Sequence, residues 1–185
     1  TIHSDGTIWF NNDEFFPIEI YKTVNFDLGS SLVTTVGAGD TLFNFGGGSI
    51  FGPSIFISND GQYISIVVMS DNIFTSGNPG GIYHYYSSDA GSTWQGEIIA
   101  RGSRYNPEFG QITNRNIAPY LSPSTLYSGV IDDNGILHLA LYGYGCSITG
   151  SDTVEYTPIL YWSSRDKNWI AVTDPVFETL IDDTG

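Results

Sequence analysis

Residues 87–94 constrain the fold of this chain more than any other segment does. They read Ser-Ser-Asp-Ala-Gly-Ser-Thr-Trp and follow a β-prone aromatic run at residues 82–86. Asp89 can accept hydrogen bonds from backbone N–H groups a few residues on, and Gly91 can take a positive φ without a Cβ clash. Trp94 supplies a large apolar anchor whose indole N–H needs one partner. The segment therefore predicts a tight turn, fastened by a carboxylate and anchored by an indole.

The pattern S-x-D-x-G-x-T-W resembles the Asp-box, or bacterial neuraminidase repeat, of sialidases and other β-propeller proteins. The resemblance assigns a structural role to five residues: Ser87, Asp89, Gly91, Thr93 and Trp94. It implies a hairpin within a four-stranded blade, and it is informative about fold far more than about chemistry. We therefore expect an Asp89→Ala variant to lose stability and to keep any ligand affinity at low temperature.

Composition favours one β-rich domain. The 185 residues include 22 Gly and 15% aromatic residues, only 14% are charged, and no capped run of helical periodicity stands out. The net charge of −14 disfavours nucleic acid and anionic membrane surfaces as partners, and no segment is long and apolar enough for membrane insertion. This acidic, lysine-poor composition is typical of extracellular, cell-surface or virion-surface proteins. A lone cysteine, Cys146, allows no intrachain disulfide.

Two segments repeat one plan of four short strands, residues 53–100 and residues 124–172. Residues 85–88 align with residues 161–164 at an offset of 76 (161 − 85). In the second segment, residues 143–152 are predicted to be a Gly-rich loop between strands.

The second segment carries a degenerate Asp-box at Ser163, Asp166 and Trp169. Arg165 stands at the Asp position, Lys167 stands at the Gly position, and one residue is missing. We therefore expect a looser turn at this place.

The fold prediction is all-β, with four-stranded antiparallel blades of β-propeller type, Asp-box hairpins and an incomplete ring. The whole chain is one propeller-like region with four parts: a partial, irregular blade at 1–52, blades at 53–100 and 124–172, and the start of a further blade at 173–185. Because a propeller ring needs at least four blades, the others would come from a longer chain, from further copies, or from an open stack. The first residue is Thr1 and not Met, which suggests an excised or processed segment.

A sialidase would need three arginines that converge on the substrate carboxylate. The chain holds four arginines, of which three fall within fifteen residues: Arg101, Arg104, Arg115 and Arg165. The family's Arg-Ile-Pro signature is absent, so no catalytic residue is assigned. Three residues near the long loops are candidates for ligand contact: Arg115, Tyr120 and Tyr144.

No metal or cofactor is expected, because the three histidines are widely separated in the sequence and lack a second ligand at short spacing. His84 and His138 alternate with apolar neighbours, so each is expected to be satisfied within a strand.

The leading functional hypothesis is a secreted or surface module that binds a glycan or a protein partner and is not catalytic as it stands. One alternative is a fragment of a sialidase-like glycoside hydrolase. The other is a structural subunit of an extracellular or virion assembly, in which the chain associates with itself or with other blades.

Overall fold

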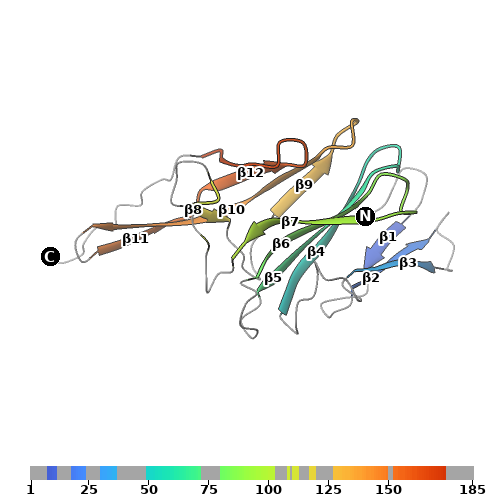
Figure 1. The fold of residues 1–185 in the computed structure, drawn as a ribbon, viewed down its shortest axis with the longest axis horizontal. Coiled ribbons are helices and arrows are strands. Elements are labelled where there is room, and N and C mark those ends of the chain that lie inside the picture. Colours follow the sequence, from blue (N-terminus) through green and yellow to red (C-terminus); the bar gives the residue numbers. More distant parts are fainter. Residues whose placement is uncertain are drawn as a thin grey trace.

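The computed structural model describes residues 8–11, 18–23, 30–36, 49–71, 80–102, 108, 110–112, 117–119, 127–149 and 152–173. Within these ranges the regular elements are all β-strands, and the paired strands run antiparallel in three sheets (Figure 1). The all-β prediction is therefore confirmed. No helix in this part of the chain has the length and apolar character to span a membrane.

The first sheet, called the N-terminal sheet, contains β1 (Ile8–Asn11), β2 (Ile18–Thr23) and β3 (Ser30–Val36) in that spatial order. The second, called the central sheet, contains β4 (Ser49–Ile57), β5 (Ile64–Asp71), β6 (Gly81–Ser87) and β7 (Gln95–Arg101), again in sequence order. Strand β4 contacts both β1 and β9, so the central sheet lies between its two neighbours.

The third sheet, called the C-terminal sheet, has six strands: β8 (Ile117–Pro119), β9 (Tyr127–Ile131), β10 (Leu137–Thr149), β11 (Asp152–Tyr156), β12 (Ile159–Ser163) and β13 (Trp169–Ala171). The long strand β10 pairs with β9 and β12 along its first half and with β8 and β11 along its second half. Strands β9, β10, β12 and β13 thus repeat the order of the central sheet.

The predicted loop at residues 143–152 is wrong, because β10 continues to Thr149 and β11 folds back on it. Glycine is depleted from strands, which is why this stretch looked like a loop. At Gly143 the absence of a side chain instead allows Leu160 and Ile117 to pack closely against the backbone of β10. A Cβ at this position would lie 2.8 Å from Leu160 Cγ and 3.0 Å from Ile117 Cγ2.

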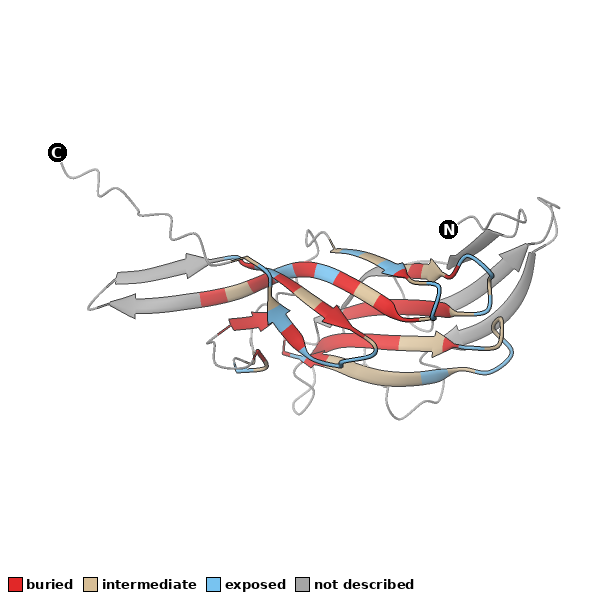
Figure 2. Ribbon diagram, turned by 90° about the horizontal axis from the view of Figure 1, so that it is seen from above, coloured by how far each residue is buried: buried red, intermediate tan, exposed pale blue. Residues whose placement is uncertain are grey.

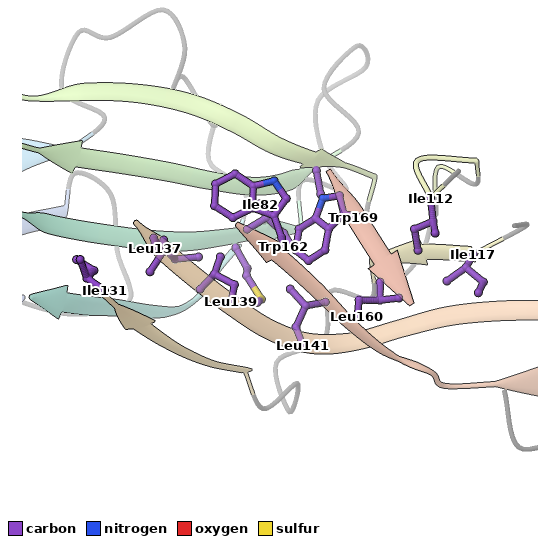
Figure 3. Packing of buried hydrophobic residues seen from close by; sticks show 13 residues of the cluster. Ile82, Ile112, Ile117, Ile131, Leu137, Leu139, Leu141, Leu160, Trp162 and Trp169 are labelled. Atoms are coloured by element: carbon purple, nitrogen blue, oxygen red, sulfur yellow. The ribbon is translucent and has the colours of Figure 1, made fainter. Parts of the chain in front are cut away.

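The main hydrophobic core lies between the central and C-terminal sheets (Figure 3). The central sheet contributes Val67, Met69, Ile82 and Ala100. The C-terminal sheet contributes Ile131, Leu137, Leu139, Leu141, Leu160, Trp162 and Trp169. The alternation of side chains along each strand sends these residues to one face of their sheet.

Polar contacts also join the two sheets. Trp169 Nε1 donates to the Ile99 carbonyl oxygen at 2.7 Å, and the Tyr127 hydroxyl donates to the Val67 carbonyl oxygen at 3.3 Å. Each of these bonds gives a half-buried or buried side chain its partner, as a polar group away from water requires. The two sheets are therefore held by hydrogen bonds as well as by apolar burial.

The opposite face of the central sheet is also covered. Ile55, Ile64, Ile66 and Val68 are buried there, and Tyr85 and Trp94 pack against them. The opposite face of the C-terminal sheet differs, because exposed and buried residues alternate along β10 (Figure 2). The central sheet is therefore buried on both of its faces, whereas the C-terminal sheet is buried on one face and exposed on the other.

Candidate functional site

Residues 87–94 form a turn held by their own side chains. Ser87 Oγ donates to Asp89 Oδ1 at 2.8 Å and accepts from the Gly91 N–H at 2.9 Å. The Asp89 carboxylate also accepts from the Thr93 N–H at 2.8 Å and from the Thr93 hydroxyl at 2.7 Å. Gly91 has a φ of 87°, a conformation that suits glycine. These bonds use the polar groups of the motif to close the turn.

Trp94 anchors this turn. Its Nε1 donates to the Gly91 carbonyl oxygen at 3.0 Å, and its ring stacks on Tyr85 with centroids 5.2 Å apart and an interplanar angle of 5°. Stacked aromatic pairs at this separation add to the free energy gained from area burial alone. The indole is thus both an apolar anchor and a donor to the backbone.

A second turn at residues 163–169 has related chemistry. Ser163 Oγ donates to Asp166 Oδ2 at 2.7 Å and accepts from the Asp166 N–H at 3.1 Å. The Asp166 carboxylate therefore accepts a hydrogen bond from the serine that begins the turn, as Asp89 does from Ser87 in the first turn. In the sequence alignment of the two turns, Arg165 and not Asp166 stands at the position of Asp89. Lys167 has a φ of 54°, in the left-handed region where the first turn has glycine.

Stability is expected to fall in acid because of two turn carboxylates. A hydrogen bond from the Thr93 hydroxyl is the main cause that lowers the pKa of Asp89 from 3.8 to about 2, and one from the Ile136 N–H does the same for Asp132. Since the folded chain binds fewer protons than the unfolded chain in this range, the stabilisation is present above about pH 4 and is lost toward about pH 2. Thermal midpoints between these pH values should show the loss.

The matched variant is Asp89→Asn combined with Asp132→Asn. It removes both titrations, so its thermal midpoint should change less steeply with pH than that of the wild type. An unchanged slope in the double variant would contradict this assignment.

A pocket of about 230 Å³ opens between the central and C-terminal sheets. Six of the residues that line it carry the argument below: Tyr63, Ser65, His84, Tyr86, Glu97 and Lys167. The first five belong to the central sheet or its turn, and Lys167 belongs to the 163–169 turn of the C-terminal sheet. The pocket therefore exists only where the two sheets pack together.

A chain of four polar side chains runs through this pocket. Lys167 Nζ lies 2.7 Å from Glu97 Oε2, Glu97 Oε1 lies 3.2 Å from His84 Nδ1, and His84 Nε2 lies 3.0 Å from Ser65 Oγ. An ionised carboxylate only accepts, so Nδ1 of the imidazole carries the proton and Nε2 accepts from the Ser65 hydroxyl. Burial lowers the pKa of His84 despite the opposing effect of Glu97, which keeps the ring neutral at pH 7. The hydrogen bond from His84 is the main cause that lowers the pKa of Glu97.

Ser65, His84 and Glu97 are hydrogen-bonded in the order serine, histidine, carboxylate, which is the order in a hydrolytic triad. However, Ser65 and His84 are almost completely buried. Ser65 is 5% exposed and His84 is 2% exposed. Tyr86 stacks on the imidazole at a centroid distance of 4.9 Å, and Trp162 packs edge-on at 5.7 Å. The imidazole is therefore fixed on both sides, and little of the Ser65 and His84 side chains is exposed.

Glycosidase chemistry needs two carboxyl groups across the scissile bond. Among the residues that line the pocket, Glu97 supplies the single carboxylate. Nor does the described part of the chain contain a cluster of three or more His, Cys, Asp or Glu side chains that could hold a metal ion.

The sequence-predicted contact residues are not brought to this pocket. Arg115 and Tyr120 lie outside the described residues, as does all but the first residue of the predicted start of a further blade at 173–185. Tyr144 is half-buried in β10, opposite Ala118 of β8, and does not line the pocket. His84 is a buried histidine with both ring nitrogens satisfied, as expected, but its partners Ser65 and Glu97 lie on the two neighbouring strands.

The residues that form the polar chain carry a signal that sequence reasoning missed. Ser65, His84 and Glu97 are polar positions on three successive strands: Ser65 lies between two isoleucines, His84 between two tyrosines, and Glu97 directly before Ile98. Such positions converge on one face when the register aligns them. Lys167 could not be found in this way, because it reaches Glu97 from a turn 70 residues away in sequence. No protein-family model matches this chain, and no curated protein matches it.

Proposed function

We propose that this chain is a propeller-type module, secreted or displayed on a cell or virion surface, that binds a glycan in the pocket between its central and C-terminal sheets. The observation that carries the proposal is the lining of the pocket. Tyr63 and Tyr86 supply aromatic surface, and the charge-balanced pair Lys167 and Glu97 supplies donors and acceptors. Tyrosine provides contact area at low conformational cost, and precise polar groups fix the orientation of a ligand.

The volume of the pocket limits the size of the ligand that it can enclose. Its volume of about 230 Å³ lies below the range of roughly 300–1,000 Å³ for sites that enclose drug-sized molecules. A single sugar ring of a larger glycan fits this description, with the remainder of the glycan in solvent. A protein partner would use a broader surface, and it remains the other ligand class of this proposal.

The strand plan supports a propeller-type arrangement. The central and C-terminal sheets repeat the same four-strand order. Both place a Trp beside an aromatic residue of the preceding strand: Trp94 stacks on Tyr85, and Trp169 lies at a tilt of 38° to Trp162, with centroids 6.2 Å apart. Repeated four-stranded sheets packed face to face are the units from which propellers are built.

The sialidase-like alternative gains no support from the described residues. Arg101 and Arg165 are exposed, and neither lines the pocket. A non-catalytic role therefore remains the stronger proposal.

A printed array of neutral and acidic oligosaccharides tests the proposal. We expect wild-type protein to bind a subset of them, and Lys167→Met to weaken that binding at least tenfold. Thermal stability should change little, because exposed ion pairs contribute about 0–1 kcal/mol. Lys22→Met is the matched control, since Lys22 lies in β2 of the N-terminal sheet and is the only other lysine.

Two results would count against the proposal. One is a folded wild-type protein that binds no oligosaccharide on the array. The other is an equal loss of binding in Lys167→Met and Lys22→Met, which would place the glycan outside the pocket.

A further inference from the structure

The pocket between the central and C-terminal sheets carries two opposite charges that neutralise each other. Among the described residues that line it, Glu97 is the only carboxylate and Lys167 is the only cation, since burial keeps His84 neutral. Lys167 Nζ lies 2.7 Å from Glu97 Oε2. The hydrogen bond from His84 lowers the pKa of Glu97, and the hydrogen bond to Glu97 raises the pKa of Lys167, so both groups are ionised at pH 7. The described lining therefore has no net charge.

An anionic ligand meets repulsion at this ion pair. A ligand carboxylate that reaches Lys167 Nζ also meets the Glu97 carboxylate, because the two side chains are in direct contact. Like charges brought together in this way are costly in a binding site. Arg101 and Arg165, the arginines of the described ranges, do not line the pocket and do not offset this repulsion. The net charge of −14 adds repulsion at longer range.

A neutral hydroxyl group finds both donors and acceptors at the same pair. The Lys167 ammonium has three donors, of which the bond to Glu97 uses one. His84 and Lys167 each occupy one oxygen of the Glu97 carboxylate, and each oxygen has a second lone pair. Two adjacent hydroxyls of a sugar ring can therefore accept from Lys167 and donate to Glu97 without separating the pair. Hydrogen bonds to ionised groups are about twice as strong as those between neutral groups.

The aromatic side chains of the pocket are held in place by the folded chain. The Tyr86 ring stacks on His84 at a centroid distance of 4.9 Å, and its hydroxyl donates to Gln95 Oε1 at 2.9 Å. The Tyr63 ring lies so close to Gly135 that a Cβ added there would clash with it. Because groups that are already ordered lose little freedom on binding, this arrangement favours affinity for a ligand that fits it.

We propose that the pocket selects a neutral sugar ring with two adjacent hydroxyl groups and rejects a ring that carries a carboxylate. The inference rests on the proposed glycan binding and states which class of glycan the pocket takes. Glu97 is the specificity-determining residue, because an acidic ring meets its charge. Without that charge, Lys167 becomes an unpaired cation that attracts a carboxylate.

Three matched sets of ligands test the inference: oligosaccharides that end in glucose, galactose or mannose, their counterparts oxidised at C6 to the uronic acid, and the methyl esters of these acids. Since the pocket has room for one ring, the carboxylate of that ring lies near the ion pair. By titration calorimetry we expect the neutral ring and the ester to bind at least tenfold more tightly than the acid. The ester has the bulk of the acid without its charge, so a steric effect would weaken both alike. The preference should persist in 1 M salt, which screens the net charge of the chain but not groups in contact.

The Glu97→Gln variant tests the role of the ion pair. Glutamine keeps an acceptor for the His84 N–H and removes the charge, so the preference for the neutral ring over the acid should fall at least tenfold. Glu155→Gln is the matched control, because it makes the same change of net charge in β11, which pairs with the second half of β10. Its preference should equal that of the wild type. A purely structural role of Glu97 would weaken binding of all three sets together and leave their ratio unchanged.

The inference and the glycan proposal fail in different ways. A wild-type protein that binds the acids as tightly as the neutral rings overturns the inference and leaves glycan binding in place. A preference that persists unchanged in folded Glu97→Gln overturns the assignment to the ion pair. A folded wild type that binds none of the three sets overturns both proposals. If Glu97→Gln does not fold, the ratio measured on the wild-type protein still decides whether the pocket prefers neutral rings.

Discussion

Trp162→Ala is expected to lower the free energy of unfolding by about 3–5 kcal/mol, the cost typical of removing a large aromatic side chain from a core. Trp162 is 1% exposed and lies between the two sheets (Figure 3). It packs against Trp169 of its own sheet and edge-on against His84 of the central sheet. Its truncation would leave a cavity at the junction that also shapes the pocket. Denaturant unfolding followed by circular dichroism measures the loss.

Trp94→Ala is the matched comparison. Trp94 is half-buried at the 87–94 turn and stacks on a single tyrosine, so its removal leaves less empty space. The loss should be smaller than that for Trp162. Equal losses in the two variants would mean that the core between the central and C-terminal sheets is not the main source of stability.

Gly135→Ala is expected to destabilise the chain by about 2–5 kcal/mol, from two causes that add. Gly135 has a φ of 77°, and a residue with a Cβ pays roughly 1–2 kcal/mol there. An added Cβ would also fall inside the van der Waals radius of the Tyr63 ring, and overpacking of this kind costs about 1–3 kcal/mol. Because Tyr63 and Gly135 both line the pocket, the proposed glycan binding should weaken as well.

Two further variants separate the causes. Gly110 has a φ of 85° with nothing within 4 Å of an added Cβ, so Gly110→Ala should show the backbone cost alone. Adding Tyr63→Ala to Gly135→Ala should recover the part that comes from the clash. If Gly110→Ala is as damaging as Gly135→Ala, the contact between the 132–136 turn and Tyr63 is not as described.

Local chemistry was predictable from the sequence because it depends on neighbours in the chain. The turn at residues 87–94 uses Ser87, Asp89 and Thr93 for backbone and side-chain bonds, as their spacing indicated. The four strands of the central sheet and the matching strands of the C-terminal sheet also follow the predicted order. Turn residues and alternating apolar residues specify such features within a few positions.

Features that depend on distant partners were not predictable in this way. No strand was predicted at residues 18–23, although Pro17 precedes this run, because nothing within the segment identifies its partners; β2 is defined by its pairing with β1 and β3. The second half of β10 was taken for a loop because its glycines were read without the packing of Leu160 and Ile117 that explains Gly143. The pocket required the register of three strands and a lysine from another sheet, and neither can be obtained from spacing alone.

The central claim is that the two sheets pack so that Lys167 meets Glu97 at the mouth of the pocket. A zero-length carbodiimide reaction, which joins an amine only to a carboxylate in direct contact, tests it most directly. With Nζ and Oε2 at 2.7 Å, the account predicts that peptide mass spectrometry finds Lys167 joined to Glu97 within one chain. A folded protein in which Lys167 joins other carboxylates and never Glu97 would contradict the packing of the sheets and the pocket with it.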